Sequence, residues 1–219
     1  MDVQEATTCR LPDLKERHLP ENCREAVNTI LKETYGYEQF RNLEIYDDLF
    51  KGKEKLCISQ GQLIENVILE AEEAWKGETK IDNILLTAPT GSGKSMLFQL
   101  PAIYLGKEYN LLTIVVSPLK ALIVDQVESL QELGYMRVAY ASSDLSPEQK
   151  MEVYRQVREG EIDLFYLSPE LLLSYDIKHF VGERRIGLVV VDSGNFSFDE
   201  YDRKHVNFLA HLTKIPPDT

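Results

Sequence analysis

A glycine-rich segment at residues 88–95 carries the residue types that bind phosphate. It reads Ala-Pro-Thr-Gly-Ser-Gly-Lys-Ser. The glycines allow a turn in which successive backbone N–H groups point at anionic oxygens. The Lys94 ammonium would reach the β- and γ-phosphates of a nucleotide, and the Ser95 hydroxyl would be a ligand of Mg²⁺. We therefore expect ATP and Mg²⁺ to bind here, through Thr90, Gly91, Ser92, Gly93, Lys94 and Ser95.

The flanking residues favour a phosphate loop over a turn that happens to contain Lys-Ser. An apolar strand, Ile84–Thr87, runs into the segment, and a helix is predicted over Met96–Tyr104. The dipole and the free N–H groups at the start of such a helix add to an anion site. Strand, spacing and helix agree, which is the context that the motif requires.

From residue 81 onward, short apolar strands alternate with amphipathic helices. Strands that are apolar throughout are typical of a parallel sheet that is buried on both faces. The alternation implies right-handed crossovers, so the fold class is α/β: a mainly parallel sheet covered by helices on both faces. The further predicted elements are strands at Leu112–Ser117, Arg137–Ala141, Leu164–Ser168 and Gly187–Asp192, and a helix over Leu119–Leu133.

Residues 1–80 have a different, helical and polar pattern. Apolar side chains recur at helical spacing in Arg24–Tyr35 and in Gln62–Trp75. The acidic block Glu70, Glu72 and Glu73 is interpreted as a solvated helix face. The expected organisation is a helical N-terminal extension over residues 1–80 and a nucleotide-binding domain over residues 81–219.

Composition limits the classes of partner. The 219 residues suit one domain with an extension, and 43% apolar and 27% charged residues are typical of a soluble globular protein. The net charge of −12 is shared equally between residues 1–80 and 81–219, so charge argues against avid nucleic-acid binding. We expect no membrane span, because the apolar runs are far shorter than about 20 residues. The cysteines Cys9, Cys23 and Cys57 lack zinc-site spacing and suit a reducing cytoplasm, so we expect a cytoplasmic protein, nucleoid-associated if bacterial.

Further segments resemble the RecQ-type branch of the superfamily-two DNA helicases, the DEAD/DEAH type. The loop begins with Ala88, as in that superfamily, and the match covers residues 35–192 in the family's order. The resemblance implies a RecA-like first motor lobe. The segments that carry it are Tyr35–Arg41 (Tyr-Gly-Tyr-Glu-Gln-Phe-Arg), Ser117–Leu122 (Ser-Pro-Leu-Lys-Ala-Leu) with Asp125-Gln126, Tyr140–Leu145, Leu167–Leu171 and Gly187–Asp192.

The resemblance implies an adenine-recognition element ahead of the phosphate loop. Tyr37 would stack on adenine with Arg41 nearby, and the Gln62 amide would read the adenine edge. The family has this glutamine within a few residues of its Phe-Arg pair, whereas residues 43–60 intervene here. Either an insertion loops out, or Gln62 is a plain surface glutamine.

The resemblance also implies a second metal ligand and contacts to DNA. Asp192 would hold Mg²⁺ together with Ser95. Ser117 and Ser168 lie where strands end and helices begin, so each either holds a DNA phosphate or caps its helix. The implied DNA-contacting residues are Ser117, Pro118, Lys120, Ser168 and Pro169.

Two departures from the family pattern alter the expected function. The family has Asp-Glu-Ala-His at the magnesium strand, whereas this chain has Asp192-Ser193-Gly194-Asn195. Serine is no general base near neutral pH without a partner, and losing such a group costs a factor of about 10²–10⁴ in rate. Asp199 or Glu200 downstream could substitute. The tail from Ser193 onward is expected to resemble nothing in the family. We also expect no second lobe, the part of the family's motors that supplies arginines to the transition state. A natural truncation, a changed reading frame and an engineered fragment stay open as explanations.

Two functions follow as alternatives. The first is the ATP-binding first lobe of a RecQ-like ATP-dependent DNA helicase, unable to unwind or hydrolyse efficiently alone and binding DNA only weakly. The second is a catalytically inactive, helicase-derived module that binds or regulates a protein partner. A third arrangement, in which a second polypeptide completes the motor as its second lobe, also stays open.

Overall fold

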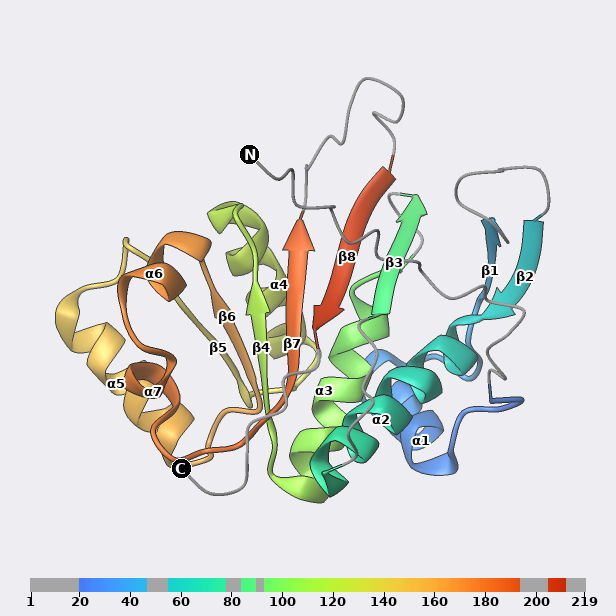
Figure 1. Ribbon diagram of the computed structural model, residues 1–219, viewed down its shortest axis with the longest axis horizontal. Helices are drawn as coiled ribbons and strands as arrows, with labels where there is room; N and C mark the ends of the chain where they lie inside the picture. Colours follow the sequence, from blue (N-terminus) through green and yellow to red (C-terminus); the bar gives the residue numbers. More distant parts are fainter. Residues whose placement is uncertain (1–19, 47–54, 78–83, 90–92, 194–204, 212–219) are drawn as a thin grey trace, which may run out of the picture.

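The computed structural model describes residues 20–46, 55–77, 84–89, 93–193 and 205–211. Its main sheet has six strands in the order β3-β8-β7-β4-β6-β5 (Figure 1). The four strands β7, β4, β6 and β5 are parallel, whereas β8 is antiparallel to both of its neighbours. The strands are β3 Ile84–Pro89, β4 Leu112–Val116, β5 Val138–Ala141, β6 Leu164–Leu167, β7 Ile186–Ser193 and β8 His205–His211.

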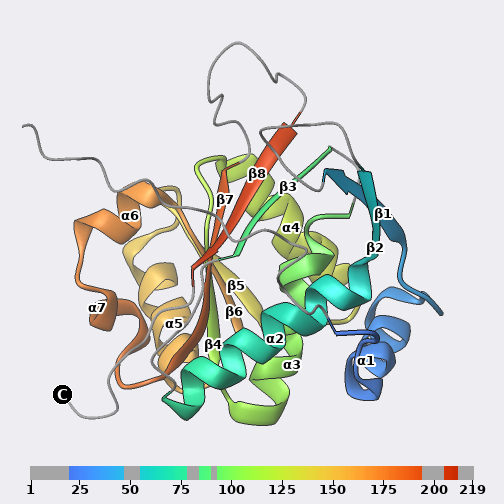
Figure 2. The ribbon, with the colours of Figure 1, turned by 45° about the vertical axis from the view of Figure 1, so that its right-hand side comes forward.

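Helices cover both faces of this sheet, which confirms the predicted α/β class (Figure 2). Along β6, Leu164 and Tyr166 belong to one apolar core and Phe165 and Leu167 to the other, as the two-residue period of a strand requires. The first core packs under α1 to α4, and the second packs under α5 and α7. The helices are α1 Glu25–Tyr35, α2 Gln60–Lys76, α3 Met96–Tyr109, α4 Lys120–Glu132, α5 Pro147–Arg158, α6 Pro169–Ser174 and α7 Ile177–Val181.

A β-hairpin interrupts the N-terminal region that the sequence predicts as helical. Strands β1, Asn42–Tyr46, and β2, Lys55–Ser59, pair antiparallel, with Asn42 opposite Ser59. The hairpin lies between the two predicted helices, and both helices share the first core with α3. The insertion therefore loops out, while the start of α2 lies beside Arg41 and beside Pro20 and Cys23, which precede α1.

A buried ion cluster joins the N-terminal region to α3. Arg24 donates to Glu65 at 2.6 Å, to Glu72 at 2.5 Å and to the Tyr104 hydroxyl at 2.6 Å. Tyr109 also donates to Glu72, at 2.9 Å. Burial acts to raise the pKa of Glu72, but the hydrogen bonds from Arg24 and Tyr109 outweigh it and lower that pKa. The interpretation of the acidic block as a solvated face is wrong for Glu72, which is buried.

Cys23 lies next to this cluster, and we expect it to be unreactive. Burial, reinforced by the negative charge of Glu65, raises the pKa of its thiol from 9.0 to about 12. The reactive thiolate is then about a thousandfold scarcer near neutral pH than for an unperturbed thiol. A short iodoacetamide pulse at pH 8, followed by peptide mass spectrometry, should modify the exposed Cys57 and spare Cys23. Equal modification of both cysteines would contradict the buried cluster.

None of the helices in the described part of the chain is long and apolar enough to cross a membrane.

Candidate nucleotide-binding site

The predicted phosphate-, metal- and DNA-contacting residues that the structure describes lie at one edge of the sheet. Strands β3, β7, β4 and β6 run in the same direction, so their carboxyl ends meet at this edge (Figure 1). Open α/β sheets bind ligands in the crevice outside these ends. Since β8 lies between them, β3 and β7 are two strand spacings apart, about 9–10 Å. The end of β3, which leads into the predicted phosphate loop, and the end of β7, which carries Asp192, therefore lie on either side of one intervening strand.

The phosphate loop leaves β3 and enters α3 as the sequence predicts. Ala88 and Pro89 end the strand, Thr90, Gly91 and Ser92 lie outside the described residues, and the chain resumes at Gly93. Met96 N donates to Gly93 O at 3.2 Å, and Leu97 N donates to Lys94 O at 3.0 Å. These bonds begin the helical turn immediately after Gly93. They place Lys94 and Ser95 at the amino end of a 14-residue helix.

Gly93 meets two requirements that only glycine satisfies. Its φ is +79°, in the left-handed region where a side chain is strained. A Cβ at this position would also lie 2.7 Å from Nε2 of Gln60, the residue that begins α2. The loop and α2 therefore approach closely through a bare backbone.

We expect Gly93→Ala to weaken nucleotide binding about five- to thirtyfold. A left-handed alanine costs about 1–2 kcal/mol, and the loop can relieve that cost by leaving its binding conformation. Gly134→Ala is the matched control, because Gly134 has φ +86° and no atom within 4 Å of its would-be Cβ. Calorimetric titration with ADP and Mg²⁺ should separate the two variants. Equal affinities would show that the Gly93 conformation is not needed for binding.

Lys94 and Asp192 form the electrostatic centre of the site. Burial lowers the pKa of Lys94, and the charge of Asp192 opposes that shift. Burial likewise raises the pKa of Asp192, and Lys94 opposes that shift. Each group is thus partly desolvated and is stabilised in its charged form by the other. A cation at the loop and a carboxylate across β8 are the charges that a Mg-nucleotide requires.

Of the predicted adenine-recognition residues, Tyr37 and Arg41 follow the end of α1, and Gln62 lies in the first turn of α2. The exposed Tyr37 ring lies under the Arg41 guanidinium, with 5.9 Å from Cζ to the ring centroid. Both ends of the Gln62 amide form hydrogen bonds within the chain. Its Oε1 accepts from Ser59 N at 3.0 Å, and its Nε2 donates to Pro20 O at 3.1 Å. The proposed role of Gln62 in reading adenine stays a prediction, but its amide already serves a helix cap.

Gln60 is the glutamine that the structure brings to the phosphate loop. It is only 2% exposed, and its Oε1 accepts from Arg41 N at 3.2 Å. Its own N–H donates to Arg41 O at 2.9 Å, so the two residues are locked together across the hairpin. Its Nε2 faces Gly93. Gln60 was not selected from the sequence because Gly61-Gln62 resembles the start of a helix, and pairing across the hairpin is not visible in the residue order.

The predicted DNA-contacting residues follow two adjacent parallel strands. Ser117, after β4, is buried, and its hydroxyl has no hydrogen-bond partner among the described residues. Ser168, after β6, caps α6, with its Oγ accepting from Leu171 N at 3.4 Å. Pro118 is exposed, and Pro169 begins α6. Contact with DNA stays a prediction for all of these residues.

Lys120 is the one cation among the predicted DNA-contacting residues, and it is already engaged. Its Nζ donates to Ser143 Oγ at 2.5 Å and to Asp144 Oδ1 at 2.9 Å. The hydrogen bond from Lys120 lowers the pKa of the Asp144 carboxyl and so favours its ionised form. Lys120 is thus paired with a carboxylate of the chain itself.

Comparison with protein families gives one match that covers most of the chain. The sequence model of the DEAD/DEAH box helicase family matches residues 62–218. The match runs beyond Asp192 into the tail, so the expectation that the tail resembles nothing in the family is wrong.

Comparison with curated proteins gives relatives that carry the RecQ name. The "ATP-dependent DNA helicase RecQ" of Synechocystis is 32% identical over 165 residues, which is 75% of this chain and 28% of the relative. Its Bacillus subtilis namesake is 30% identical over 167 residues, or 76% of this chain and 23% of the relative. The "ATP-dependent DNA helicase Q-like 5" of Arabidopsis thaliana is 37% identical over 112 residues, or 51% and 12%. The chain thus spans about a quarter of the length of the bacterial relatives.

Proposed function

Because the chain belongs to the DEAD/DEAH box helicase family, we propose that it is the ATP-binding first motor lobe of a RecQ-like DNA helicase. The observation that carries the proposal is the pairing of Lys94, at the start of α3, with Asp192, at the end of β7. A phosphate-loop protein needs a lysine for the phosphates and an aspartate for Mg²⁺ at this edge of the sheet.

The residues present fit a Mg-nucleotide. The Ser95 hydroxyl and the Asp192 carboxylate are oxygen donors, the class of ligand that Mg²⁺ prefers. When bound, the ion supplies charge neutralisation between the β- and γ-phosphates. Lys94 and the N–H groups at the start of α3 hold the phosphates, and Tyr37 offers an exposed ring for the base.

We further propose that the lobe hydrolyses ATP slowly by itself. Ser193 follows Asp192 where the family has the glutamate that polarises water. Asp199 and Glu200, which could substitute, lie outside the described residues. A rate reduced by about 10²–10⁴ is the expected consequence. Efficient turnover and unwinding would then need a second lobe, in the same polypeptide or in a partner, and DNA would bind weakly to this lobe alone.

The state of Lys120 favours one alternative, a binding or regulatory module that engages a protein instead of DNA. An internally neutralised lysine in a chain of net charge −12 offers little to a phosphate backbone. This alternative predicts one stoichiometric protein partner in a pull-down and no nucleotide binding. The helicase lobe predicts nucleotide binding whether or not a partner is captured.

Titration with ATP and Mg²⁺ tests the proposal through Lys94→Ala. Hydrogen bonds to charged groups contribute about 1.5–3 kcal/mol, so this variant should bind about ten- to a hundredfold more weakly. Lys107→Ala is the matched control, because Lys107 is an exposed lysine in the last turn of the same helix. Wild-type protein that does not bind, or a Lys94→Ala variant that binds like Lys107→Ala, would refute a phosphate-loop site.

A further inference from the structure

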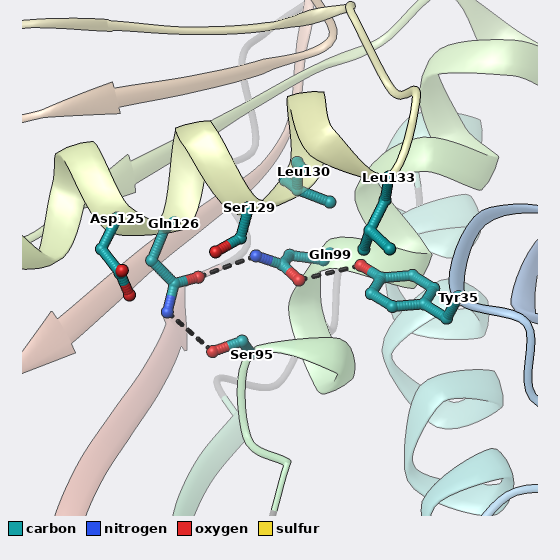
Figure 3. Close-up of a pocket in the computed structure, with 8 residues that line it drawn as sticks. All are labelled: Tyr35, Ser95, Gln99, Asp125, Gln126, Ser129, Leu130 and Leu133. Atoms are coloured by element: carbon teal, nitrogen blue, oxygen red, sulfur yellow. Dashed lines mark hydrogen bonds between the residues drawn. The ribbon is translucent and has the colours of Figure 1, made fainter.

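A chain of hydrogen bonds connects the end of α1 to the metal-ligand serine (Figure 3). Tyr35 OH donates to Gln99 Oε1 at 2.8 Å, and Gln99 Nε2 donates to Gln126 Oε1 at 2.7 Å. Gln126 Nε2 then donates to Ser95 Oγ at 2.8 Å. These four residues, Tyr35, Gln99, Gln126 and Ser95, are called the amide relay below. They line a pocket of about 170 Å³ between α3, α4 and the end of α1.

The hydrogen bonds of the amide relay all run from Tyr35 toward Ser95. Burial raises the pKa of the Tyr35 hydroxyl, so this group is protonated over the whole working range and can donate. Gln99 presents Oε1 to Tyr35 and its amide nitrogen to Gln126. That nitrogen also donates to the hydroxyl of Tyr166, at 3.2 Å, which fixes the Gln99 amide a second time. Gln126 is left with its nitrogen facing Ser95.

The middle of the relay is buried, so its members have little freedom to rearrange. Gln99 is 5% exposed and Tyr166 is 1% exposed. Buried amides keep their hydrogen bonds, because an unpaired one costs about 1–3 kcal/mol. The Gln99 amide, which donates to Gln126, is thus held by the core of the lobe.

We infer that Gln126 is a positioning residue for Mg²⁺, acting through Ser95. A serine hydroxyl has two lone pairs, and the hydrogen bond from Gln126 occupies one of them. The other is then directed for the ion, at no cost in rotamer freedom when the ion binds. Hydrogen bonds behind a metal ligand contribute about ten- to a hundredfold in metal affinity. The inference rests on the proposed function, because it assigns a role within the Mg-nucleotide site.

The relay also joins three functional segments. Tyr35 begins the predicted adenine-recognition segment 35–41, and Ser95 ends the predicted phosphate loop. Gln126 lies on α4, which begins at Lys120, one of the predicted DNA-contacting residues. A small displacement of α4 would therefore change the support of the metal ligand directly.

The test is calorimetric titration with ADP in two buffers, one containing Mg²⁺ and one containing EDTA. Gln126→Met keeps the length of the side chain but removes the donor to Ser95. The increase in affinity that Mg²⁺ causes should fall about ten- to a hundredfold, whereas affinity in EDTA should stay at the wild-type value. Gln131→Met is the matched control, the same change at an exposed position of α4.

Tyr35→Phe provides a second variant that keeps the ring and removes only the distal donor. It should reduce the Mg²⁺-dependent increase in the same direction, by a smaller factor. If Gln126→Met and Tyr35→Phe both keep the full Mg²⁺ effect of the wild type, the inference is wrong and the proposed function stands. If the wild type binds ADP in neither buffer, both are wrong.

Discussion

Replacing Asp163 by alanine should lower the free energy of unfolding by about 3–5 kcal/mol, the usual cost of removing one partner from a buried ion cluster. The Asp163 side chain has no exposed surface, and its carboxylate accepts from Arg137 at 2.6 and 2.8 Å, from Arg184 at 2.9 Å and from Tyr135 at 3.1 Å. Arg184 is itself buried, so the variant would leave a guanidinium charge in the interior with only neutral partners.

Urea denaturation measures this loss, and Glu152→Ala is its control. Glu152 forms an ion pair with Arg155 on the exposed face of α5, where solvent screening leaves little net stabilisation. Gly106→Ala offers an independent check, because its Cβ would lie 2.4 Å from Asp163 Cγ. The cluster lies at the amino ends of β5, β6 and β7, opposite the nucleotide edge. Nucleotide affinity of the folded Asp163→Ala protein should therefore be unchanged; a wild-type urea midpoint would contradict the account.

Removing β8 should abolish nucleotide binding and destabilise the sheet. Within the described residues, β8 is the only strand that pairs with β3, and it pairs with β7 on its other side. A chain ending at residue 204 would leave β3, which carries the phosphate loop, without a ladder to the Asp192 strand. It would also expose two unpaired strand edges, which promote aggregation.

A chain ending at residue 211 is the matched control, because it retains β8 and lacks only the residues after it. Leu209→Pro gives the same test by substitution, since Leu209 lies opposite Leu85 on one side and Val191 on the other, and proline removes a ladder N–H from a central strand. Thermal unfolding and ADP titration should both separate these proteins. Equal binding by the chains ending at 204 and 211 would show that β8 is dispensable.

The part of the fold that repeats strands and helices was predictable from local pattern. The five strands expected from Ile84 to Asp192 are all confirmed within one or two residues at each end, because strands buried on both faces are continuously apolar. The helix after the phosphate loop was predictable from a different local signal, because Gly93, Lys94 and Ser95 are typical of a turn followed by a helix start. The RecQ-like resemblance is likewise confirmed.

The features that could not be predicted from the sequence depend on pairing between residues that are far apart in the chain. The hairpin of β1 and β2 is short and carries no buried alternating pattern long enough to recognise. The position of Gln60 beside the phosphate loop could not be predicted, because it depends on the hairpin that brings Arg41 and α2 together. Glu72 was interpreted as solvated because its partner, Arg24, is 48 residues away. Strand β8 sits between two strands that are more than 90 residues apart, and no local signal specifies that position.

We propose that the edge formed by Lys94, Ser95 and Asp192 binds Mg-nucleotide but turns it over slowly. A titration with ATP and Mg²⁺, in which bound nucleotide and released phosphate are both measured, tests both halves of this proposal at once. We expect saturable binding at one site per chain, with phosphate release slower by a factor of about 10²–10⁴ than a typical enzyme rate of about 10 s⁻¹. Absence of saturable binding, or release near the typical rate, would contradict it.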